Sequence, residues 1–310
     1  MPELTIVIPA YNEGPGLFAC VELLLGQTKA DGLDPALVLV DDGSADSTWE
    51  QMLLLAEKYP RISCVKLSRN FGKEAAIFAG IERVTSELCL VMDADMQHPP
   101  SVIRRMYDKM ALTGCDIVEG VKAARGKETA SSSFFARGFY GLLRLLGGVD
   151  LANSSDFKLL NRGAVEAVNR FRESAVFFRG LIQWSGFHRE KVYFSVGGRA
   201  GGKSSFSSGM RAKFAASAIL SHSSKPLYLV VAVGLLFLLG AAALAIQTLV
   251  GFFRGSSVSG FTTVILLILI TGSLVMLALG VIGAYIARIF DEVKRRPRYL
   301  VAARAESKKE

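Results

Sequence analysis

Residues 88–97 read LCLVMDADMQ, an apolar run that ends in two acidic residues separated by one position. Similar apolar runs, rich in β-branched residues, precede it at residues 4–8, 36–40 and 62–67. Helix-length stretches separate these runs at residues 16–27, 48–59 and 73–84. Continuous apolar strands that alternate with helices predict a mostly parallel sheet with helices on both faces. We therefore expect an α/β fold.

Polar residues gather directly after three of these runs. They read PAYNE at residues 9–13, DDGS at 41–44 and DADMQ at 93–97. In open α/β sheets, ligands bind outside the carboxyl ends of the strands. We therefore expect the three segments to converge at one edge of the sheet and to form the functional site.

Asp93 and Asp95 have the residue types that bind a hard divalent cation between carboxylates and a diphosphate. Magnesium and manganese prefer such oxygen ligands, and the amide oxygen of Gln97 is a candidate third ligand. Pairs of this spacing are also frequent by chance, and acidic residues at strand ends often cap helices. The pair gains weight because Asp41 and Asp42 end a neighbouring run.

Two stretches near the C-terminus, residues 227–253 and 261–287, contain no Asp, Glu, Lys or Arg. Each exceeds the ~20 apolar residues that cross a bilayer as a helix. We expect a catalytic-looking domain over residues 1–225, two transmembrane helices within 226–288 and a basic tail over 289–310. A cluster of basic residues follows the second stretch: Arg288, Lys294, Arg295, Arg296, Arg298, Arg304, Lys308 and Lys309. The positive-inside rule then places the domain and both termini in the cytoplasm.

Residues 133–147 and 210–222 combine Phe and Leu with Arg or Lys. Both segments are candidates for amphipathic helices in the bilayer interface. The alternative is that they are surface helices packed on the sheet. The formal net charge of +8 is explained by this membrane topology and by anionic lipid. We expect no nucleic-acid partner, because basic and aromatic residues are not interleaved in a binding motif.

The blocks at these strand ends resemble the inverting, family-2 glycosyltransferases of GT-A fold, which have a Rossmann-like sheet. Two further blocks narrow the resemblance to the polyprenyl-phosphate type, which includes dolichol-phosphate mannose synthases and bactoprenol glucosyltransferases. The blocks are VIPAYNE at residues 7–13, VDDGSADST at 40–48, LSRNFGKE at 67–74 and DADMQHPP at 93–100. Two C-terminal spans match the bacterial glucosyltransferases best. The resemblance implies an enzyme of the bacterial inner membrane that joins a nucleotide-sugar to undecaprenyl phosphate.

The resemblance also implies roles for individual residues. The base and ribose of the nucleotide-sugar would lie against Pro9, Tyr11, Glu13 and Asp41, and Ala94 would lie beside the donor. Mg²⁺ or Mn²⁺ would be held by Asp93, Asp95 and Gln97. Arg199 would close over the phosphates. The family lysine is absent at position 205, where the chain has serine, so Lys203 is its candidate replacement. Lys122 is either a further phosphate ligand or a solvated loop charge.

Asp156 matches the family position usually called the catalytic base. A phosphate monoester has its second pKa near 6 and is already mostly dianionic at pH 7. General-base help therefore matters less than for an alcohol, and Asp156 either orients the acceptor or takes the residual proton. If it takes the proton, Asp156→Asn loses less activity at pH 8 than at pH 6. The acceptor phosphate would be screened by Arg69, Lys73, Arg137 and Arg179.

Other functions stay open at this point. We expect UDP-glucose as donor, with GDP-mannose as the nearest competitor. A processive polysaccharide synthase usually has more spans and a Gln-x-x-Arg-Trp motif, which the chain lacks. A degenerate domain acting as a membrane scaffold is the non-enzymatic alternative, against which the intact Asp93, Asp95 and Asp156 argue. Small residues at Gly280 and Gly283 permit close helix packing, within one chain or in a homo-oligomer.

Overall fold

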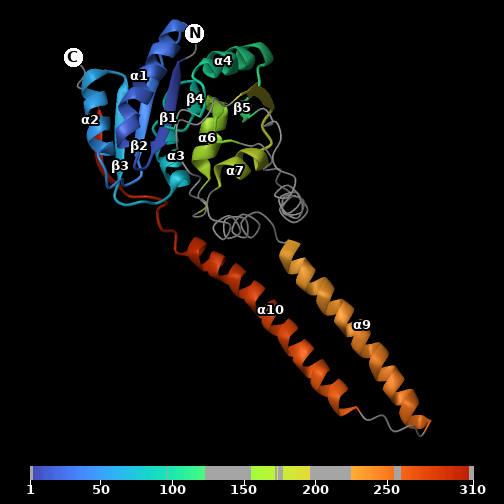
Figure 1. The fold of residues 1–310 in the computed structure, drawn as a ribbon. Helices are drawn as coiled ribbons and strands as arrows, with labels where there is room; N and C mark the ends of the chain where they lie inside the picture. Colours follow the sequence, from blue (N-terminus) through green and yellow to red (C-terminus); the bar gives the residue numbers. More distant parts are fainter. Residues whose placement is uncertain are drawn as a thin grey trace. The chain divides into compact units, whose positions relative to one another are not determined.

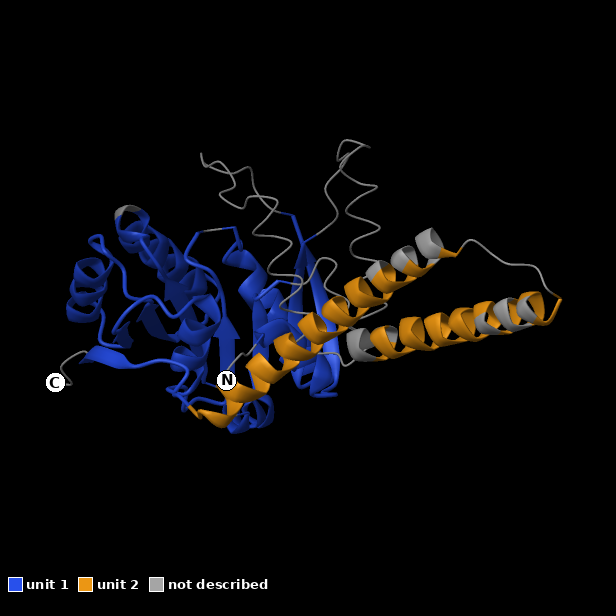
Figure 2. Cartoon of the chain, turned by 90° about the horizontal axis from the view of Figure 1, so that it is seen from below, with its two compact units in different colours: residues 1–140, 149–205, 296–310 blue, residues 141–148, 206–295 orange. Residues whose placement is uncertain are grey.

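The computed structural model describes residues 3–95, 97–122, 155–171, 173, 177–195, 225–254 and 260–306. The chain forms two compact units, which Figure 2 shows in blue and orange. The sheet unit comprises residues 1–140, 149–205 and 296–310, and the helical unit comprises 141–148 and 206–295. Several expectations lie outside the described residues: the segments 133–147 and 210–222, and the side chains Arg137, Arg199 and Lys203.

The sheet unit contains an eight-stranded mixed sheet with the strand order β7-β5-β6-β4-β1-β2-β3-β8 (Figure 1). The strands are β1 Leu4–Ala10, β2 Ala36–Asp41, β3 Ile62–Leu67, β4 Leu88–Val91, β5 Ile117–Lys122, β6 Lys158–Asn161, β7 Arg189–Phe194 and β8 Val301–Glu306. The helices of this unit are α1 Gly14–Ala30, α2 Thr48–Lys58, α3 Lys73–Ile81, α4 Ser101–Thr113, α6 Arg162–Arg170 and α7 Phe178–Trp184. Strands β3, β2, β1 and β4 are parallel, as expected, whereas β6 and β8 pair antiparallel to their neighbours.

Helices cover both faces of the sheet, which explains the uninterrupted apolar runs. Along β1, Ile6 and Ile8 belong to the core beneath α1, α2 and α4. Val7, between them, belongs to the core beneath α3, α6 and α7. Successive side chains of a strand point to opposite faces, so a strand buried on both faces needs an apolar residue at every position. The expected two-sided α/β sheet is confirmed.

Strand β1 continues past the point where the sequence suggested that it ends. Pro9 was expected after the strand, but it pairs with Val40, and Ala10 pairs with Asp41. A proline has no N–H to donate and is tolerated where a strand lacks a neighbour. On the β4 side, pairing with β1 ends at Val7, so the missing N–H of Pro9 leaves no gap in that ladder.

Residues 289–306, which we expected to lie in a separate basic tail, contain regular secondary structure. Helix α10 continues to Val293, and residues 301–306 form strand β8, which pairs antiparallel with β3 at the edge of the sheet. Exposure alternates along β8, and Val301 and Ala305 pack against the core. Without β8, the edge of β3 would present unpaired backbone groups. The sheet unit is therefore completed from the far end of the chain.

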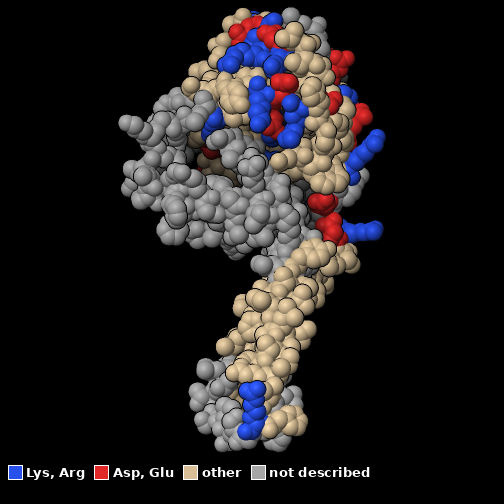
Figure 3. Space-filling view, turned by 90° about the vertical axis from the view of Figure 1, so that its right-hand side faces the viewer, with Lys and Arg blue, Asp and Glu red and all other residues tan. Residues whose placement is uncertain are grey.

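The helical unit contains α9 Lys225–Phe253 and α10 Phe261–Val293, which pack against each other. The described surface of these helices carries few charged side chains (Figure 3). Within the described residues, Ile270–Val293 is long and apolar enough to cross a membrane, judged by length and composition. Val230–Leu244 is a shorter apolar stretch of α9. The expected pair of membrane spans therefore remains a prediction.

Candidate functional site

The loops after β1 and β2 interlock at the carboxyl edge of the sheet. The Asn12 N–H donates to the Ser44 hydroxyl at 2.9 Å, and the Ala45 N–H donates to the Asn12 side-chain oxygen at 3.0 Å. Asn12 has φ of 56°, a left-handed conformation that asparagine tolerates better than most residues. These bonds bring the first two polar segments together and leave Tyr11 exposed beside them.

The third polar segment lies against the first. Burial raises the pKa of Glu13, and the negative charges of Asp95, Asp46 and Asp93 raise it further. Such mutual repulsion requires the carboxylates to be close together. The convergence of all three strand ends, expected from the sequence, is what the structure shows. Such a concentration of negative charge attracts a cation.

Asp41 is buried at the end of β2 and has one oxygen available to a ligand. The Ser44 N–H donates to Oδ1 at 2.8 Å. The Lys66 ammonium lies 3.8 Å from Oδ2, and among the described residues no hydrogen-bond donor reaches Oδ2. A buried oxygen in this state costs free energy unless it gains a partner. Asp41 therefore suits a ligand N–H, such as that of a nucleotide base.

The neighbouring residues Asp42 and Gly43 have a structural role. The two carboxylate oxygens of Asp42 accept from the N–H groups of Phe71 and Gly72, at 2.8 and 2.9 Å. Gly43 has φ of 67°, and a Cβ atom there would lie 2.3 Å from the backbone carbon of Arg69. These contacts hold the loop that leads into α3.

A candidate metal site is formed by Asp93, Asp95 and His98, whose ligand atoms all lie within 4.8 Å of one another. The His98 Nδ1 accepts from the Asp93 N–H at 3.4 Å, and its ring stacks on Phe157 with centroids 4.7 Å apart. Burial lowers the pKa of His98, which favours the neutral ring. The two carboxylates suit a divalent cation, and His98 in this conformation uses its acceptor nitrogen on the Asp93 N–H and carries its proton on Nε2. The sequence indicated the carboxylates but gave little weight to His98.

The structure also shows the surroundings of Gln97, expected on the metal, and of Ala94, expected beside the nucleotide-sugar. The Gln97 amide oxygen, expected on the metal, accepts from the Lys122 ammonium at 2.9 Å. The Gln97 N–H donates to Asp95 Oδ1 at 3.0 Å. The side chain of Ala94 is buried in the core, so only its backbone is available to a donor. Lys122 is therefore not a solvated loop charge but lies against the candidate metal site.

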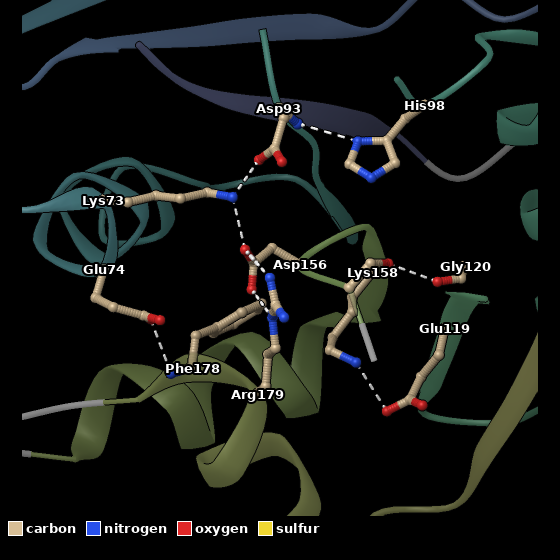
Figure 4. Close-up of polar contacts among 11 residues, drawn as sticks. Lys73, Glu74, Asp93, His98, Glu119, Gly120, Asp156, Lys158, Phe178 and Arg179 are labelled. Atoms are coloured by element: carbon tan, nitrogen blue, oxygen red, sulfur yellow. Dashed lines mark hydrogen bonds and ion pairs between the residues drawn. The ribbon is translucent and has the colours of Figure 1, made fainter. Parts of the chain in front are cut away.

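Asp156 is bound by two cations from other elements (Figure 4). The Arg179 guanidinium donates from Nε to Oδ1 at 2.6 Å and from its terminal nitrogen to Oδ2 at 2.8 Å. The Lys73 ammonium lies 2.6 Å from Asp156 Oδ2 and 2.6 Å from Asp93 Oδ1. Lys73 thus joins the candidate metal site to the carboxylate expected to act as base. The sequence had assigned both cations to the acceptor phosphate, and the structure places them together.

The ionisation of Asp156 follows from these contacts. Its side chain is 3% exposed, and burial alone would raise its pKa. The hydrogen bonds and charges of Arg179 and Lys73 outweigh burial and hold the pKa well below its usual range. A carboxylate with so low a pKa is a poor proton acceptor near neutral pH. The geometry favours a positioning role for Asp156 over the role of base.

Glu74 is a further carboxylate of this group. Its Oε2 accepts from the Phe178 N–H, at the start of α7, at 2.8 Å. Burial raises the pKa of Glu74 to about 7, and the negative charge of Asp156 adds to the shift. Glu74 lies in the block at residues 67–74, but nothing in its sequence context shows that it reaches α7. It holds the first turn of the helix that carries Arg179.

Behind Asp156 lies a buried ion pair between neighbouring strands. The Lys158 ammonium of β6 lies 2.9 Å from Oε1 of Glu119 in β5, and these residues are directly opposite in the ladder. The Lys158 side chain is 1% exposed. Arg189 of β7 approaches the same oxygen at 3.4 Å. The sequence signal for this ion pair is Lys158, a charged residue within the otherwise apolar stretch 157–160.

Arg69 contacts residues of its own loop. Its guanidinium stacks over the Phe71 ring, 4.1 Å from the centroid, and donates to the Asn70 carbonyl at 3.0 Å. It belongs to the loop held by Asp42. The expected role of Arg69 at the acceptor phosphate remains a prediction.

Comparisons with known proteins agree with this architecture. The solved structure of glucosyl-3-phosphoglycerate synthase from Mycobacterium tuberculosis, in complex with Mn²⁺, UDP-glucose and phosphoglyceric acid, matches with a TM-score of 0.50. The match covers 71% of this chain and 79% of that chain at 17% identity, which shows a shared fold.

Sequence relatives match over nearly the whole chain. The Synechocystis protein named uncharacterized glycosyltransferase sll0501 is 35% identical over 305 residues, 97% of this chain and 95% of its own length. The bactoprenol glucosyl transferase of Shigella phage SfX is 30% identical over 308 residues, 97% of this chain and 99% of its own length. Residues 5–168 match the family model of glycosyl transferase family 2. The resemblance read from the strand-end blocks is thus confirmed, and the chain belongs to glycosyl transferase family 2.

Proposed function

We propose that this enzyme transfers a sugar from a nucleotide-sugar to a polyprenyl phosphate at a membrane surface, with inversion at the anomeric carbon. One observation carries the proposal: the Lys73 ammonium joins the carboxylate group at the end of β4 to the Asp156–Arg179 pair. A donor site for a metal-bound diphosphate and a cationic site for a second phosphate are thereby adjacent. A relative named for transfer to bactoprenol supports the acceptor.

The donor would bind at the edge formed by β1, β2 and β4. Oδ2 of Asp41, which no described hydrogen-bond donor reaches, suits a base N–H, and Tyr11 and Glu13 would flank the ribose. We propose UDP-glucose, since a neighbour of the same fold holds UDP-glucose with Mn²⁺ and a relative is named as a glucosyl transferase. Asp93 and Asp95 would hold Mg²⁺ or Mn²⁺, with His98 or Gln97 beside them. A divalent cation bound there supplies charge stabilisation for the departing diphosphate.

The acceptor would approach Arg179 and Lys73. A phosphate monoester is largely dianionic at neutral pH, so its oxygen attacks without prior deprotonation. The new bond forms at the anomeric carbon as the bond to the diphosphate oxygen breaks, and a single displacement inverts the configuration. Asp156 would hold both cations in place for the acceptor. Arg137 would add charge on the acceptor side, and Lys122, Arg199 and Lys203 on the donor side.

We further propose that α9 and α10 both cross the bacterial inner membrane, with the sheet unit in the cytoplasm. The uncharged stretches 227–253 and 261–287 support two spans, and the basic residues after α10 support this orientation. A lipid acceptor whose phosphate lies at the bilayer surface requires an enzyme held at that surface. Association between copies through the small residues of α10 is a further part of this proposal.

The test is turnover by the full-length protein in detergent with Mg²⁺ and undecaprenyl phosphate. UDP-glucose, UDP-N-acetylglucosamine, UDP-galactose and GDP-mannose are offered separately, and both nucleoside diphosphate and lipid-linked sugar are measured. We expect turnover with UDP-glucose that needs metal and lipid and is lost in Asp95→Ala. Asp108→Ala is the matched control, because Asp108 is an exposed carboxylate that pairs with Arg104 on α4. Turnover with GDP-mannose instead would make the enzyme a mannose synthase. Metal-dependent nucleotide binding without turnover of any donor would favour the scaffold.

A further inference from the structure

Lys73 occupies a position between two carboxylates of different proposed roles. It is the first residue of α3, and its ammonium lies 2.6 Å from Asp93 Oδ1 and 2.6 Å from Asp156 Oδ2 (Figure 4). Asp93 belongs to the candidate metal site, whereas Asp156 binds Arg179. The Lys73 ammonium therefore neutralises part of the negative charge of Asp93 and part of that of Asp156.

The carboxylate group at the end of β4 favours a cation even without a metal. Asp93, Asp95 and Glu13 interact closely enough for their charges to raise the pKa of Glu13 after the larger effect of burial. The Lys73 ammonium lies at ion-pair distance from a carboxylate oxygen of Asp93 and from one of Asp156. Lys73 therefore supplies a positive charge to this group.

We propose that the Lys73 ammonium is a built-in counter-ion of the metal site. A divalent cation that binds there displaces this ammonium from Asp93 toward Asp156, on the acceptor side. This inference rests on the proposed function. A metal ion and an ammonium on the same carboxylate oxygen lie close together and repel strongly, so each weakens the binding of the other. Lysine has a flexible four-carbon stem, and the Lys73 side chain is 42% exposed, so the ammonium can turn away from Asp93.

Displacement would change the charge on the acceptor side. Lys73 keeps its contact with Asp156, which already carries the bidentate Arg179. With Asp93 held by the metal, Lys73 and Arg179 face the carboxylates of Asp156 and Glu74 alone, so the group becomes more positive than before, which suits a phosphate dianion. Metal binding at the donor site thus prepares the acceptor site. Because such coupling is reciprocal, an acceptor phosphate on Lys73 also favours the metal.

The first experiment measures Mn²⁺ binding to the full-length protein in detergent, without nucleotide or lipid, from the electron paramagnetic resonance signal of free Mn²⁺. Lys73→Met removes the charge and keeps a long side chain, whereas Lys73→Arg keeps the charge. Lys109→Met is the matched control, since Lys109 is 36% exposed and lies 3.3 Å from Glu190 on other elements. We expect Lys73→Met to bind Mn²⁺ about tenfold more tightly, and the other two variants to stay within about twofold of the wild type.

A second experiment needs no substitution at Lys73. The wild-type protein is treated with an amine-acylating reagent, and modification is measured by mass spectrometry with and without Mn²⁺. We expect modification of Lys73 to increase with Mn²⁺, while that of Lys109 stays constant. This measurement decides the question if Lys73→Met does not fold.

Three outcomes would overturn the inference. They are unchanged or weaker Mn²⁺ binding by a folded Lys73→Met, no effect of Mn²⁺ on the labelling of Lys73, and unchanged Mn²⁺ binding by Asp95→Ala, which would place the metal elsewhere. None of these measurements involves turnover. Failure of every donor in the turnover assay would therefore refute the glycosyl transfer without deciding the competition for Asp93.

Discussion

Replacing Glu119 with leucine would leave the buried Lys158 ammonium without its carboxylate. Lys158 is 1% exposed, and Glu119 lies 2.9 Å from it and directly opposite in the neighbouring strand. Removing one member of a buried ion pair typically costs about 3–5 kcal/mol of unfolding free energy, because the other charge stays buried. Arg189 also approaches Glu119, but its side chain is one-third exposed and can turn to solvent.

The loss of unfolding free energy in Glu119→Leu has an upper limit that depends on pH. Lys158 can lose its proton instead of staying charged, and burial already lowers its pKa. Deprotonating a lysine of ordinary pKa ~10.4 at pH 7.5 costs about 4 kcal/mol. For a domain of this size each kcal/mol lowers Tm by roughly 2–4 °C, so we expect Tm to fall by about 8–16 °C.

The variant should also regain stability as pH rises. Lys158 is then neutral in the folded state, whereas in the unfolded chain it stays protonated up to its ordinary pKa. The unfolded state binds more protons, so the unfolding free energy rises by about 1.4 kcal/mol per pH unit between about 7.5 and 10. In the double variant Glu119→Leu/Lys158→Met neither charge remains. Apolar replacements of buried ion pairs are often neutral, so we expect its Tm within about 4 °C of the wild type.

Thermal unfolding followed by tryptophan fluorescence checks these values in the full-length protein. The chain has two tryptophans, Trp49 and Trp184, and both lie in the sheet unit. Lys158→Met alone should lose less stability than Glu119→Leu, because Glu119 keeps Arg189 as a partner. If Glu119→Leu unfolds within about 2 °C of the wild type at pH 7.5, or if its Tm does not rise with pH relative to the double variant, the reasoning about this ion pair is wrong.

Three further predictions concern the loops around the site. Gly43→Ala should abolish the folded state, because the new Cβ atom would meet the backbone of Arg69. Gly114 also has a positive φ, of 63°, but open space around it, so Gly114→Ala should lower Tm by only a few degrees. Thermal unfolding followed by circular dichroism distinguishes the two variants. Asp156→Asn should reduce turnover by the same factor at pH 6 and pH 8, because Arg179 and Lys73 hold the carboxyl ionised throughout; a smaller loss at pH 8 would restore the role of base. In the wild type, the unfolding free energy should fall as pH rises because Glu74 loses its proton, and Glu74→Gln should lack this pH dependence. The pKa of Glu74 is about 7 in the folded state and higher than in the unfolded state, so its contribution to stability is complete below about pH 4.5 and is lost as pH rises through 7. Parallel curves of Tm against pH for the variant and the wild type would contradict this prediction.

Local patterns made much of the site predictable. Asp41, Asp93 and Asp95 follow apolar runs, and the carboxyl ends of parallel strands lie at one edge of a sheet. The position of each residue relative to its strand was enough to place them together. The exact end of β1 was less certain, because Pro9 stays within the strand only where β4 has already ended.

The partners of the charged residues could not be predicted in the same way. Lys73 and Asp156 are far apart in sequence, and nothing near either residue shows that they meet. Glu74 reaches the N–H of Phe178, and Lys158 faces Glu119 across a ladder. Each contact depends on which strands and helices become neighbours, and strand order is a property of the whole sheet.

The amino-acid sequence by itself determined the two-sided α/β sheet, the carboxylates at its edge and the long uncharged stretches, because strand periodicity, strand ends and hydropathy are local properties. Only the tertiary structure decided that residues 301–306 complete the sheet beside β3 and that Asp156 is held by two cations. The physical reason is that pairing energies and pKa values depend on distances in space. Those distances are set once the chain has folded, whatever the separation along it.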